Sequence, residues 1–327
     1  MRLYRQLADI PDSPAGRFVT VGTFDGVHRG HQALLHSLCQ EARQMNIPAC
    51  VVTFDPHPQY ILGTRPFPGI LSTTSEKLAH FRRIGIDEVF LIPFTAEFAR
   101  TEPEEFVREW LVARLRMRAI LIGHDHMFGQ GRRGNIELLQ RLGAELGFTV
   151  VQFPAFTVGE LPISSSRIRR ALQSGAVEQA AELLGYPYTV CGTVVHGDGR
   201  GRSLGFPTAN LALEDPRKLL PAYGVYIVTT LIAGTPYAGL ASYGVRPTFG
   251  SNLPPQLEVH ILDFHGPLYN ERLCLSFWKW VRAEMSFPDT DSLQHQMRAD
   301  VNFCRAWIAE HRVLERSLTE VAQPNAD

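Results

Sequence analysis

Two histidines lie close together where a short apolar run meets a helical pattern. The run RFVTVG at 17–22 leads into GTFDGVHRGHQALL, which places His28 and His31 in a turn and in the first turn of a helix starting near Gly30. In α/β folds the carboxyl end of a parallel strand and a helix N-terminus bind phosphates, and imidazoles there add donors for a charged transition state. The pattern predicts a nucleotide site, also lined by Gly22, Asp25, Gly26 and Gly30. A zinc site is the alternative for HxxH spacing, but no HExxH motif or nearby cysteine supports it.

Two more motifs carry polar side chains suited to the same site. TFDPHP at 53–58 follows the second strand-like run and places Asp55 and His57 at the same edge of the predicted sheet. ISSSRIRRAL at 163–172 is typical of a helix start with a serine cap and arginines in the first turn. The helix dipole favours acids at that position, so we expect an anion to account for the arginines. The residues concerned are Ser164, Ser165, Ser166, Arg167 and Arg169.

A literal GxGxxG, formed by Gly129, Gly131 and Gly134, lies between a strand and a helix. It supports a rival hypothesis, an NAD-binding dehydrogenase domain. Six residues, 123–128, separate the strand end from the first glycine, whereas dinucleotide binding needs the turn directly after the strand. We therefore interpret the segment as a mobile loop over a ligand.

The second half carries a glycine-rich turn followed by neutral oxygen ligands, GTVVHGDGRGRSLGFPTANL at 192–211. Backbone amides exposed by glycines can hold phosphates without a lysine. Thr208 and Asn210 offer oxygen atoms to a hard cation such as Mg²⁺.

Further on, LEVHILDF at 257–264 alternates between apolar and polar residues, so Glu258 and His260 share one strand face. A carboxylate fixed on a strand can take a proton from an alcohol. Spacing alone does not decide between Glu258 and His260 for that role.

Strand-like and helical patterns alternate through the first half. The strand-like runs lie at 17–22, 49–54, 88–93, 119–123 and 149–154. Apolar residues recur at helical spacing between them, at 34–45, 106–115 and 138–142. Continuous apolar strands joined by helices predict right-handed crossovers and an α/β fold with a doubly wound parallel sheet.

The pattern changes near residue 186. Two helical runs end at Gly185, and the strand-like runs after Pro187 are separated by glycine and proline turns, with no long helix until about Asp291. This pattern predicts a small antiparallel β-barrel with a C-terminal helix. We therefore expect two domains, 1–185 and 186–327.

Composition excludes several classes of function. The formal net charge is −1, so no bulk positive field exists to hold a phosphate backbone, and no nucleic-acid partner is expected. None of the three lysines, Lys77, Lys218 and Lys279, follows a glycine, which excludes a Walker P-loop. No apolar run approaches the roughly 20 residues of a membrane span and the N-terminus carries no targeting pattern, so no membrane partner is expected.

The cysteines predict a reducing compartment. They are odd in number, widely scattered and never paired as CxxC: Cys39, Cys50, Cys191, Cys274 and Cys304. This pattern favours reduced thiols over a disulfide framework or a zinc site, and so a cytoplasmic protein.

Together the motifs resemble those of the bacterial bifunctional riboflavin kinase and FMN adenylyltransferase (FAD synthetase) family, in order, over nearly the whole chain. GTFDGVHRGH, TFDPHP and ISSSRIR resemble the adenylyltransferase signatures, and HGDGRGRSLGFPTAN, SYGVRPTF and LEVHILDF the kinase signatures. The resemblance implies that the second domain makes FMN and ADP from riboflavin and ATP. The first domain would then make FAD and pyrophosphate from FMN and a second ATP, and both reactions would require Mg²⁺.

The resemblance also assigns roles by position. His28 and His31 would stabilise the ATP phosphates during attack by the FMN phosphate, and Glu258 would be the base for the ribityl hydroxyl. Thr208 and Asn210 would hold Mg²⁺ and ATP phosphate. Further contacts to ATP would come from Gly22, Phe24, Asp25, Gly30, Ser164, Ser165, Arg167, Arg169, Gly197 and Gly205. Contacts to flavin would come from Asp55, Asp125, Phe128 and Arg282.

The chain departs from the family pattern at three places: His126 and Met127 in an aromatic-rich loop, Ser242 and Tyr243 before the GVRPT run, and Ser286 at a usual lysine. The proposed phosphate and base positions are intact. Besides the dehydrogenase, two alternatives remain: a nucleotidyltransferase of another substrate, and a flavin sensor without catalysis. The presence of both His31 and Glu258 argues against the sensor.

Overall fold

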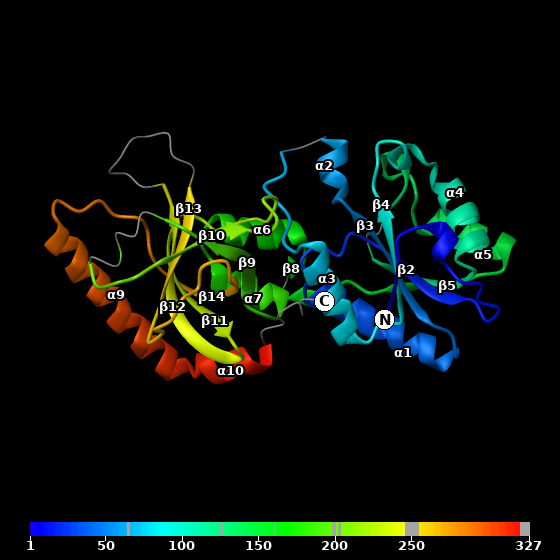
Figure 1. Ribbon diagram of the computed structural model, residues 1–327. Helices are drawn as coiled ribbons and strands as arrows, with labels where there is room; N and C mark the ends of the chain where they lie inside the picture. The colour runs from blue at the N-terminus through cyan, green and yellow to red at the C-terminus, as the bar shows by residue number, and fades with distance from the viewer. Residues whose placement is uncertain are drawn as a thin grey trace. The chain divides into compact units, whose positions relative to one another are not determined.

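The computed structural model describes residues 1–63, 66–124, 127–159, 161–197, 201, 204–245 and 255–320. Figure 1 shows the chain, whose described part divides into two compact units, residues 1–164 and residues from Ser165 onward. No helix within these described ranges is long and apolar enough to cross a membrane.

Six parallel strands form the sheet of the first unit, in the order β1-β4-β3-β2-β5-β6. All residues of β2 are buried, which explains why Phe18 to Val21 are apolar or β-branched without alternation. Arg17, the first residue of the strand, is buried in an ion pair with Glu88. The strand order reverses between β2 and β5, and such a switch point is where α/β sheets bind ligands at the strand carboxyl ends. The strands are β1 Arg2–Tyr4, β2 Arg17–Val21, β3 Ala49–Asp55, β4 Glu88–Pro93, β5 Met117–Gly123 and β6 Thr149–Phe153.

Helices cover both faces of this sheet, which confirms the doubly wound fold. On one face α1 (Arg29–Gln44) and α3 (Thr74–Ile84) pack in one apolar cluster with Phe18 of β2 and Val51 of β3. On the other face the π-helical η3 (Phe106–Arg114) and α5 (Ile136–Leu146) pack with Val19 and its neighbours. The smaller elements of this unit are η1 Leu7–Asp9, α2 Pro58–Leu62, η2 Phe98–Arg100, α4 Pro103–Glu105, η4 Gln130–Arg132, β7 Thr157–Val158 and β8 Leu161–Pro162.

Among the strands of the sheet and the helices that cover it, β1 and α3 were not predicted from sequence. β1 has three residues, too few to show a period. α3 is delimited by a capping box between Thr73 and Glu76 and by Gly85 in the left-handed conformation. The T-x-x-E pattern and the following glycine were therefore the signals that could have located this helix.

Six antiparallel strands close into a barrel in the second unit, in the order β10-β13-β12-β11-β14-β9, which confirms the predicted architecture. Helices α9 (Thr290–His311) and α10 (Val313–Glu320) bury Cys304, Ile308 and Val313 in a cluster with Ile227 and Trp278 of the barrel. In Figure 1, α9 is the long orange helix beside the barrel. The strands are β9 Tyr188–Val195, β10 Ala209–Leu213, β11 Gly224–Ile232, β12 Thr235–Gly244, β13 Gln256–Ile261 and β14 Arg272–Arg282.

Two shorter helices, α6 (Ser165–Gln173) and α7 (Val177–Leu184), belong to the same compact unit as the barrel. The Lys279 ammonium of β14 donates to Glu178 of α7 at 2.5 Å, and the backbone N–H of Ala222 donates to the Leu172 carbonyl at 2.9 Å. These helices lie before the predicted boundary at 185/186. That boundary stays a prediction about where the two catalytic domains separate.

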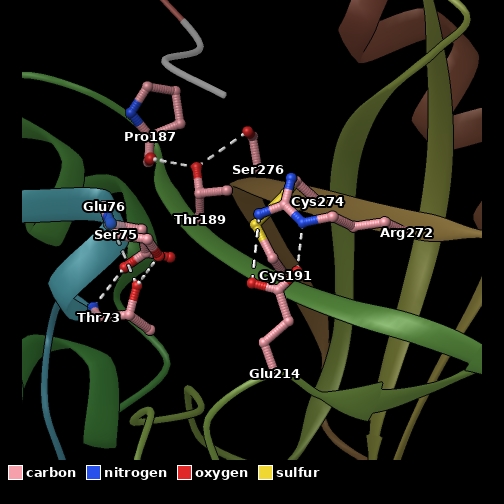
Figure 2. The surroundings of a disulfide bond; sticks show 10 residues. All are labelled: Thr73, Ser75, Glu76, Pro187, Thr189, Cys191, Glu214, Arg272, Cys274 and Ser276. Carbon is pink, nitrogen blue, oxygen red and sulfur yellow. Dashed lines mark hydrogen bonds and ion pairs between the residues drawn. A yellow bond between two sulfur atoms is a disulfide. The ribbon is translucent and has the colours of Figure 1, made fainter. Parts of the chain in front are cut away.

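The expectation that all cysteines are reduced thiols is wrong for two of them. Figure 2 shows a disulfide between Cys191 of β9 and Cys274 of β14. These residues are direct partners in the antiparallel register, with Cα atoms 4.0 Å apart, although 83 positions separate them in sequence. Barrel closure brings the two strands together, and linear spacing carries no sign of it. The other three cysteines, Cys39, Cys50 and Cys304, are free and buried.

Thiol counting tests this disulfide. Protein isolated without reductant and then denatured should titrate with three thiols against Ellman's reagent, and with five after reduction. A variant with both Cys191→Ser and Cys274→Ser should give three under either condition, because only the bonded pair is removed. Five thiols in unreduced wild type would show that the pair does not form.

Candidate functional site

In the first unit, the carboxyl end of β2 runs through loop 22–28 into α1. Helix α1 begins at Arg29, close to the predicted start, and its N-cap is His28, whose Nδ1 accepts from the backbone N–H of His31 at 3.3 Å. An acceptor Nδ1 leaves the proton of a neutral imidazole on Nε2. His28 is therefore both the cap of the helix and a donor at its N-terminus.

The rings of His28 and His31 stack on each other, with centroids 3.6 Å apart. Burial lowers the pKa of His28 to about 4, although Asp25 opposes the shift. Burial, with His28 and Lys77 nearby, holds the pKa of His31 well below its ordinary value. Both rings are thus neutral at pH 7. His31 Nδ1 is buried without a hydrogen-bond partner in the described chain, which is unusual for a buried polar atom.

Loop 22–28 is held by Asp25, whose side chain is 2 % exposed. Its Oδ1 accepts from the backbone N–H groups of Leu71 and Ser72 at 2.9 and 3.0 Å, and the backbone N–H of Gly26 donates to Ser72 Oγ at 2.8 Å. The sequence predicted Asp25 as an ATP contact. The structure adds an anchoring role, whose partners 46 and 47 positions away could not be read from the motif.

The other loop residues lie around the histidine pair. Phe24 is buried, and its ring makes T-shaped contacts with two others. The ring centroids are 5.2 Å apart for Phe24 and His31 and 5.7 Å apart for Phe24 and Phe81. The backbone N–H of Gly22 donates to the Val52 carbonyl of β3 at 3.0 Å. A Cβ on Gly30 would lie 3.4 Å from the His28 ring, so the helix start passes close beneath that ring.

The second motif lies at the end of β3, the strand next to β2. Asp55 is the last residue of β3 and is half-buried. His57 caps α2 by accepting from the backbone N–H of Gln59 at 3.2 Å, and its ring stacks on Phe67 at 4.6 Å. The expected placement of Asp55 and His57 at one sheet edge, the edge of loop 22–28, is confirmed.

Lys77 of α3 is a polar residue that sequence reasoning missed. It is 5 % exposed, and its ammonium donates to the Thr23 carbonyl after β2 and the Phe54 carbonyl in β3. Its position four residues before buried Phe81 was the available signal, because that spacing assigns a lysine to the apolar face of a helix.

The segment carrying GxGxxG is not a dinucleotide-binding turn. Gly129 caps the short turn η4 and Gly131 lies within it, with positive φ angles of 69° and 61°, and α5 begins only at Ile136 with Asn135 as its cap. Phe128 is half-buried against Phe106, and a Cβ on Gly134 would lie 2.7 Å from its ring. Its flavin contact stays a prediction, and Asp125 and His126 lie outside the described residues.

The serine–arginine motif lies at the start of the second compact unit. Helix α6 begins at Ser165, directly after Ser164, as predicted. Arg167 is half-buried and Arg169 is 8 % exposed. Whether this motif joins the histidines around one nucleotide stays a prediction.

In the barrel, the register brings together the residues that the sequence singled out. Asn210 of β10 and Glu258 of β13 are direct partners, and Ser242 of β12 lies on the other side of Glu258. The Thr208 hydroxyl donates to Glu258 Oε2 at 3.1 Å. Both Glu258 and His260 lie on the half-buried face of β13, as predicted, while the alternating residues are buried.

This cluster fits a hard cation. Asn210 Oδ1 is buried with no hydrogen-bond partner in the described chain, and Thr208 Oγ1 lies beside a carboxylate. These are oxygen donors of the kind Mg²⁺ takes alongside phosphates and water. A Cβ on Gly197 would lie 2.0 Å from Asn210 Nδ2, so only glycine lets the chain pass this close to that amide. Gly205 lies in the left-handed conformation at φ 81° in the segment that leads to Thr208.

His260 and Arg282 are each engaged by protein groups. His260 Nδ1 is 2.8 Å from the Pro207 carbonyl, so this nitrogen carries the proton and donates. The Arg282 guanidinium donates to Asp300 of α9 at 2.9 Å and to the Ala283 carbonyl at 3.1 Å. The contact of Arg282 with flavin stays a prediction.

Comparison with known proteins assigns each half of the chain to a family. Residues 10–167 match the FAD synthetase family and residues 184–308 the riboflavin kinase family. The chain is 39 % identical over 302 residues to the bifunctional riboflavin kinase/FMN adenylyltransferase of Escherichia coli strain K12, covering 92 % of this chain and 96 % of that protein. The chain belongs to this bifunctional family. It is a transferase with both activities, which imply riboflavin, FMN and ATP as substrates, and such enzymes generally need a divalent metal.

Other family members and a solved structure cover the chain equally broadly. The protein of the same name from Listeria monocytogenes is 37 % identical over 295 residues, covering 90 % of this chain and 93 % of that protein. A crystal structure from Streptococcus pneumoniae, titled a macrolide-efflux protein, matches with a TM-score of 0.82 at 32 % identity, covering 93 % of this chain and 98 % of that one. Membership of the family excludes the dehydrogenase and the non-catalytic sensor.

Proposed function

We propose that loop 22–28 and the start of α1 bind the ATP that adenylylates FMN, and that His28 and His31 act on its phosphates. A phosphate oxygen of FMN attacks the α-phosphorus, the α–β bridging bond breaks, and pyrophosphate leaves. The neutral Nε2–H of His28 and the ring of His31 stand at a helix N-terminus, where donors stabilise charge that develops on the departing phosphates. The unpartnered buried Nδ1 of His31 is the observation that carries this assignment.

The same proposal gives this site its remaining contacts. Gly22, Phe24, Asp25 and Gly30 shape the loop, and Ser164, Ser165, Arg167 and Arg169 would supply hydroxyl and guanidinium donors to the triphosphate. Asp55, Asp125 and Phe128 would lie by the flavin in the adenylyltransferase, and Arg282 in the kinase.

In the barrel, we propose that Glu258 is the base of the kinase. The 5′-hydroxyl of riboflavin gives its proton to the Glu258 carboxylate, its oxygen attacks the γ-phosphorus of ATP, and ADP leaves. Glu258 accepts a hydrogen bond from the Thr208 hydroxyl, which places its carboxylate beside the proposed metal ligands Thr208 and Asn210. Nδ1 of the competing His260 donates to the Pro207 carbonyl, which leaves Nε2 of that ring as an acceptor, so the support for Glu258 is its position next to these ligands.

We further propose Mg²⁺ as the metal of both reactions, held in the kinase by Thr208 and Asn210. When bound, the ion neutralises charge on the phosphates. Gly197 and Gly205 shape the turn beside it, with backbone amides available to the same phosphates. The hard oxygen character of the two ligands is the support for this choice over a softer metal.

For the location of the protein we propose the cytoplasm, because both reactions consume ATP. The Cys191–Cys274 disulfide opposes this, since reducing compartments keep thiols reduced. Thiol counting after acid-quenched lysis with immediate alkylation tests this proposal. A cytoplasmic protein should show five thiols at lysis, with Cys191 and Cys274 forming their disulfide only after isolation, whereas three thiols at lysis would contradict the proposed location.

Replacing His31 tests the adenylyltransferase site. His31→Ala should lower the turnover of FAD formation from FMN, ATP and Mg²⁺ by roughly 100- to 1,000-fold, the usual loss for one preorganised donor. Products are separated by chromatography. FMN formation from riboflavin by the same preparation should stay at the wild-type rate, which controls for the preparation and for folding of the barrel unit. An unchanged melting temperature of the first unit controls for folding around His31. FAD formation near the wild-type rate would show that the site is placed wrongly.

Replacing Glu258 tests the kinase base. Glu258→Gln keeps size and polarity but removes the proton acceptor, so FMN formation should fall by roughly 100- to 10,000-fold. FAD formation from supplied FMN should be unchanged, because its nucleophile is an already ionised phosphate. His260→Ala is the matched variant on the same strand face. Full kinase activity in Glu258→Gln together with a loss in His260→Ala would move the base to His260.

Fragments test the domain boundary that we propose at 185/186. A fragment beginning at Tyr186 should fold and make FMN but no FAD, because the barrel has its own core and ATP site. A fragment beginning at Ser165 is the control, since it retains α6 and α7; it should melt at a higher temperature because it keeps the apolar face that α7 buries. FAD formation by either fragment, or an unfolded Tyr186 fragment, would contradict the proposed domains.

A further inference from the structure

Lys77 occupies a position that ordinary helix energetics disfavour. It lies in the first turn of α3, where the helix dipole repels a cation, and its side chain is 5 % exposed. Lysine is almost never buried unless its charge is compensated. Burial lowers the pKa of Lys77, and the neighbouring carboxylates Asp25 and Asp55 oppose that shift. Some interaction near the N-terminus of α3 must therefore offset the free-energy cost of burying this ammonium and of placing it at the positive end of the helix dipole.

The contacts of its ammonium join two strand ends. Nζ donates to the Thr23 carbonyl at 3.4 Å and to the Phe54 carbonyl at 3.2 Å. Thr23 lies in loop 22–28 after β2, and Phe54 is the residue before Asp55 at the end of β3. The Thr53 hydroxyl donates to the same Thr23 carbonyl at 3.3 Å. Lys77 thus connects the loop that carries His28 and His31 with the loop that follows Asp55.

The segment before Lys77 holds the same loop from a second point. The backbone of Leu71 and Ser72 binds the Asp25 carboxylate, and Lys77 binds the carbonyl of Thr23, two residues earlier in the loop. Segment 71–77 therefore contacts loop 22–28 at two points, the side chain of Asp25 and the backbone carbonyl of Thr23. The charge of Lys77 also acts on the histidine pair, because Lys77 is among the groups that lower the pKa of His31.

We propose that Lys77 is a positioning residue of the adenylyltransferase: its ammonium ties the carboxyl ends of β2 and β3 together and places a positive charge beside His31. This inference rests on the proposed function of His28 and His31. The tie keeps the backbone of loop 22–28 in the shape that receives the triphosphate, and the charge adds to burial, the main cause of the lowered pKa of His31, in keeping that ring neutral. A purely space-filling role would need only an unbranched apolar chain of the same length.

Substitution separates these two roles. Lys77→Met keeps length and removes the ammonium, whereas Lys77→Arg keeps a cation with donors. Lys77→Met should lower kcat for FMN adenylylation by roughly 10- to 100-fold, as a small misplacement of reacting groups does. Lys77→Arg should recover part of that loss. Lys218→Met is the matched control, because Lys218 is also buried, at 7 % exposure, but lies in the barrel unit; it should leave adenylylation unchanged.

Two readouts accompany turnover. FMN formation by each variant reports the integrity of the barrel and of the preparation. Titration of the His31 ring by NMR, assigned by its absence in His31→Ala, reports the charge beside it. The midpoint should rise in Lys77→Met and stay low in Lys77→Arg, since removing a neighbouring positive charge favours the protonated ring. If Lys77→Met does not fold, Lys77→Gln takes its place under the same criteria.

Two results would overturn the proposal. One is adenylylation by Lys77→Met within about two-fold of wild type. The other is an equal loss in Lys77→Met and Lys77→Arg with an unchanged His31 titration, which would indicate packing alone. A failure of the underlying site is distinguishable, because His31→Ala would then retain FAD formation whatever the Lys77 variants do.

Discussion

The burial of one carboxylate determines the shape of loop 22–28. Asp25 is almost completely enclosed, and a buried carboxylate is tolerated only when donors satisfy its oxygens. The backbone N–H groups of Leu71 and Ser72 provide them, so the loop after β2 is fixed by a segment distant in sequence. His28 is the last residue of that loop and the N-cap of α1, so the path of the loop sets the position of the cap. The stacked histidine pair, and with it the proposed chemistry, depends on this one compensated charge.

The barrel positions its residues by a different constraint, the register of a closed sheet. In a closed barrel no strand can slip without moving every partner, because each strand is hydrogen-bonded on both sides. Asn210, Glu258 and Ser242 are therefore neighbours across three strands although they come from distant parts of the sequence. The carboxylate and the amide keep their spacing without a loop anchor of the kind that Asp25 provides.

Local patterns predicted the elements whose environment is uniform. The central parallel strands are buried on both faces, and β13 is buried on one, so continuous and alternating apolar runs identified them. Helix α3 was not predicted because Lys77 and His80 occupy part of its buried face, which weakens the apolar pattern. The Cys191–Cys274 pair and the hydrogen-bond partners of Asp25 were also not predicted. Both depend on contacts between segments far apart in sequence, which no local period encodes.

Neutral histidines suit adenylyl transfer better than charged ones would. A cationic ring would bind the ground-state triphosphate strongly, and binding that is equal in the ground and transition states does not accelerate the step. A neutral N–H donor held in a buried site gains strength as negative charge grows on the departing pyrophosphate. Two effects keep His28 neutral. Burial lowers its pKa to about 4, and protonation of Nδ1 would remove the acceptor that caps α1. The contact that begins the helix therefore also selects the tautomer with its proton on Nε2, which is the donor that the proposed site requires.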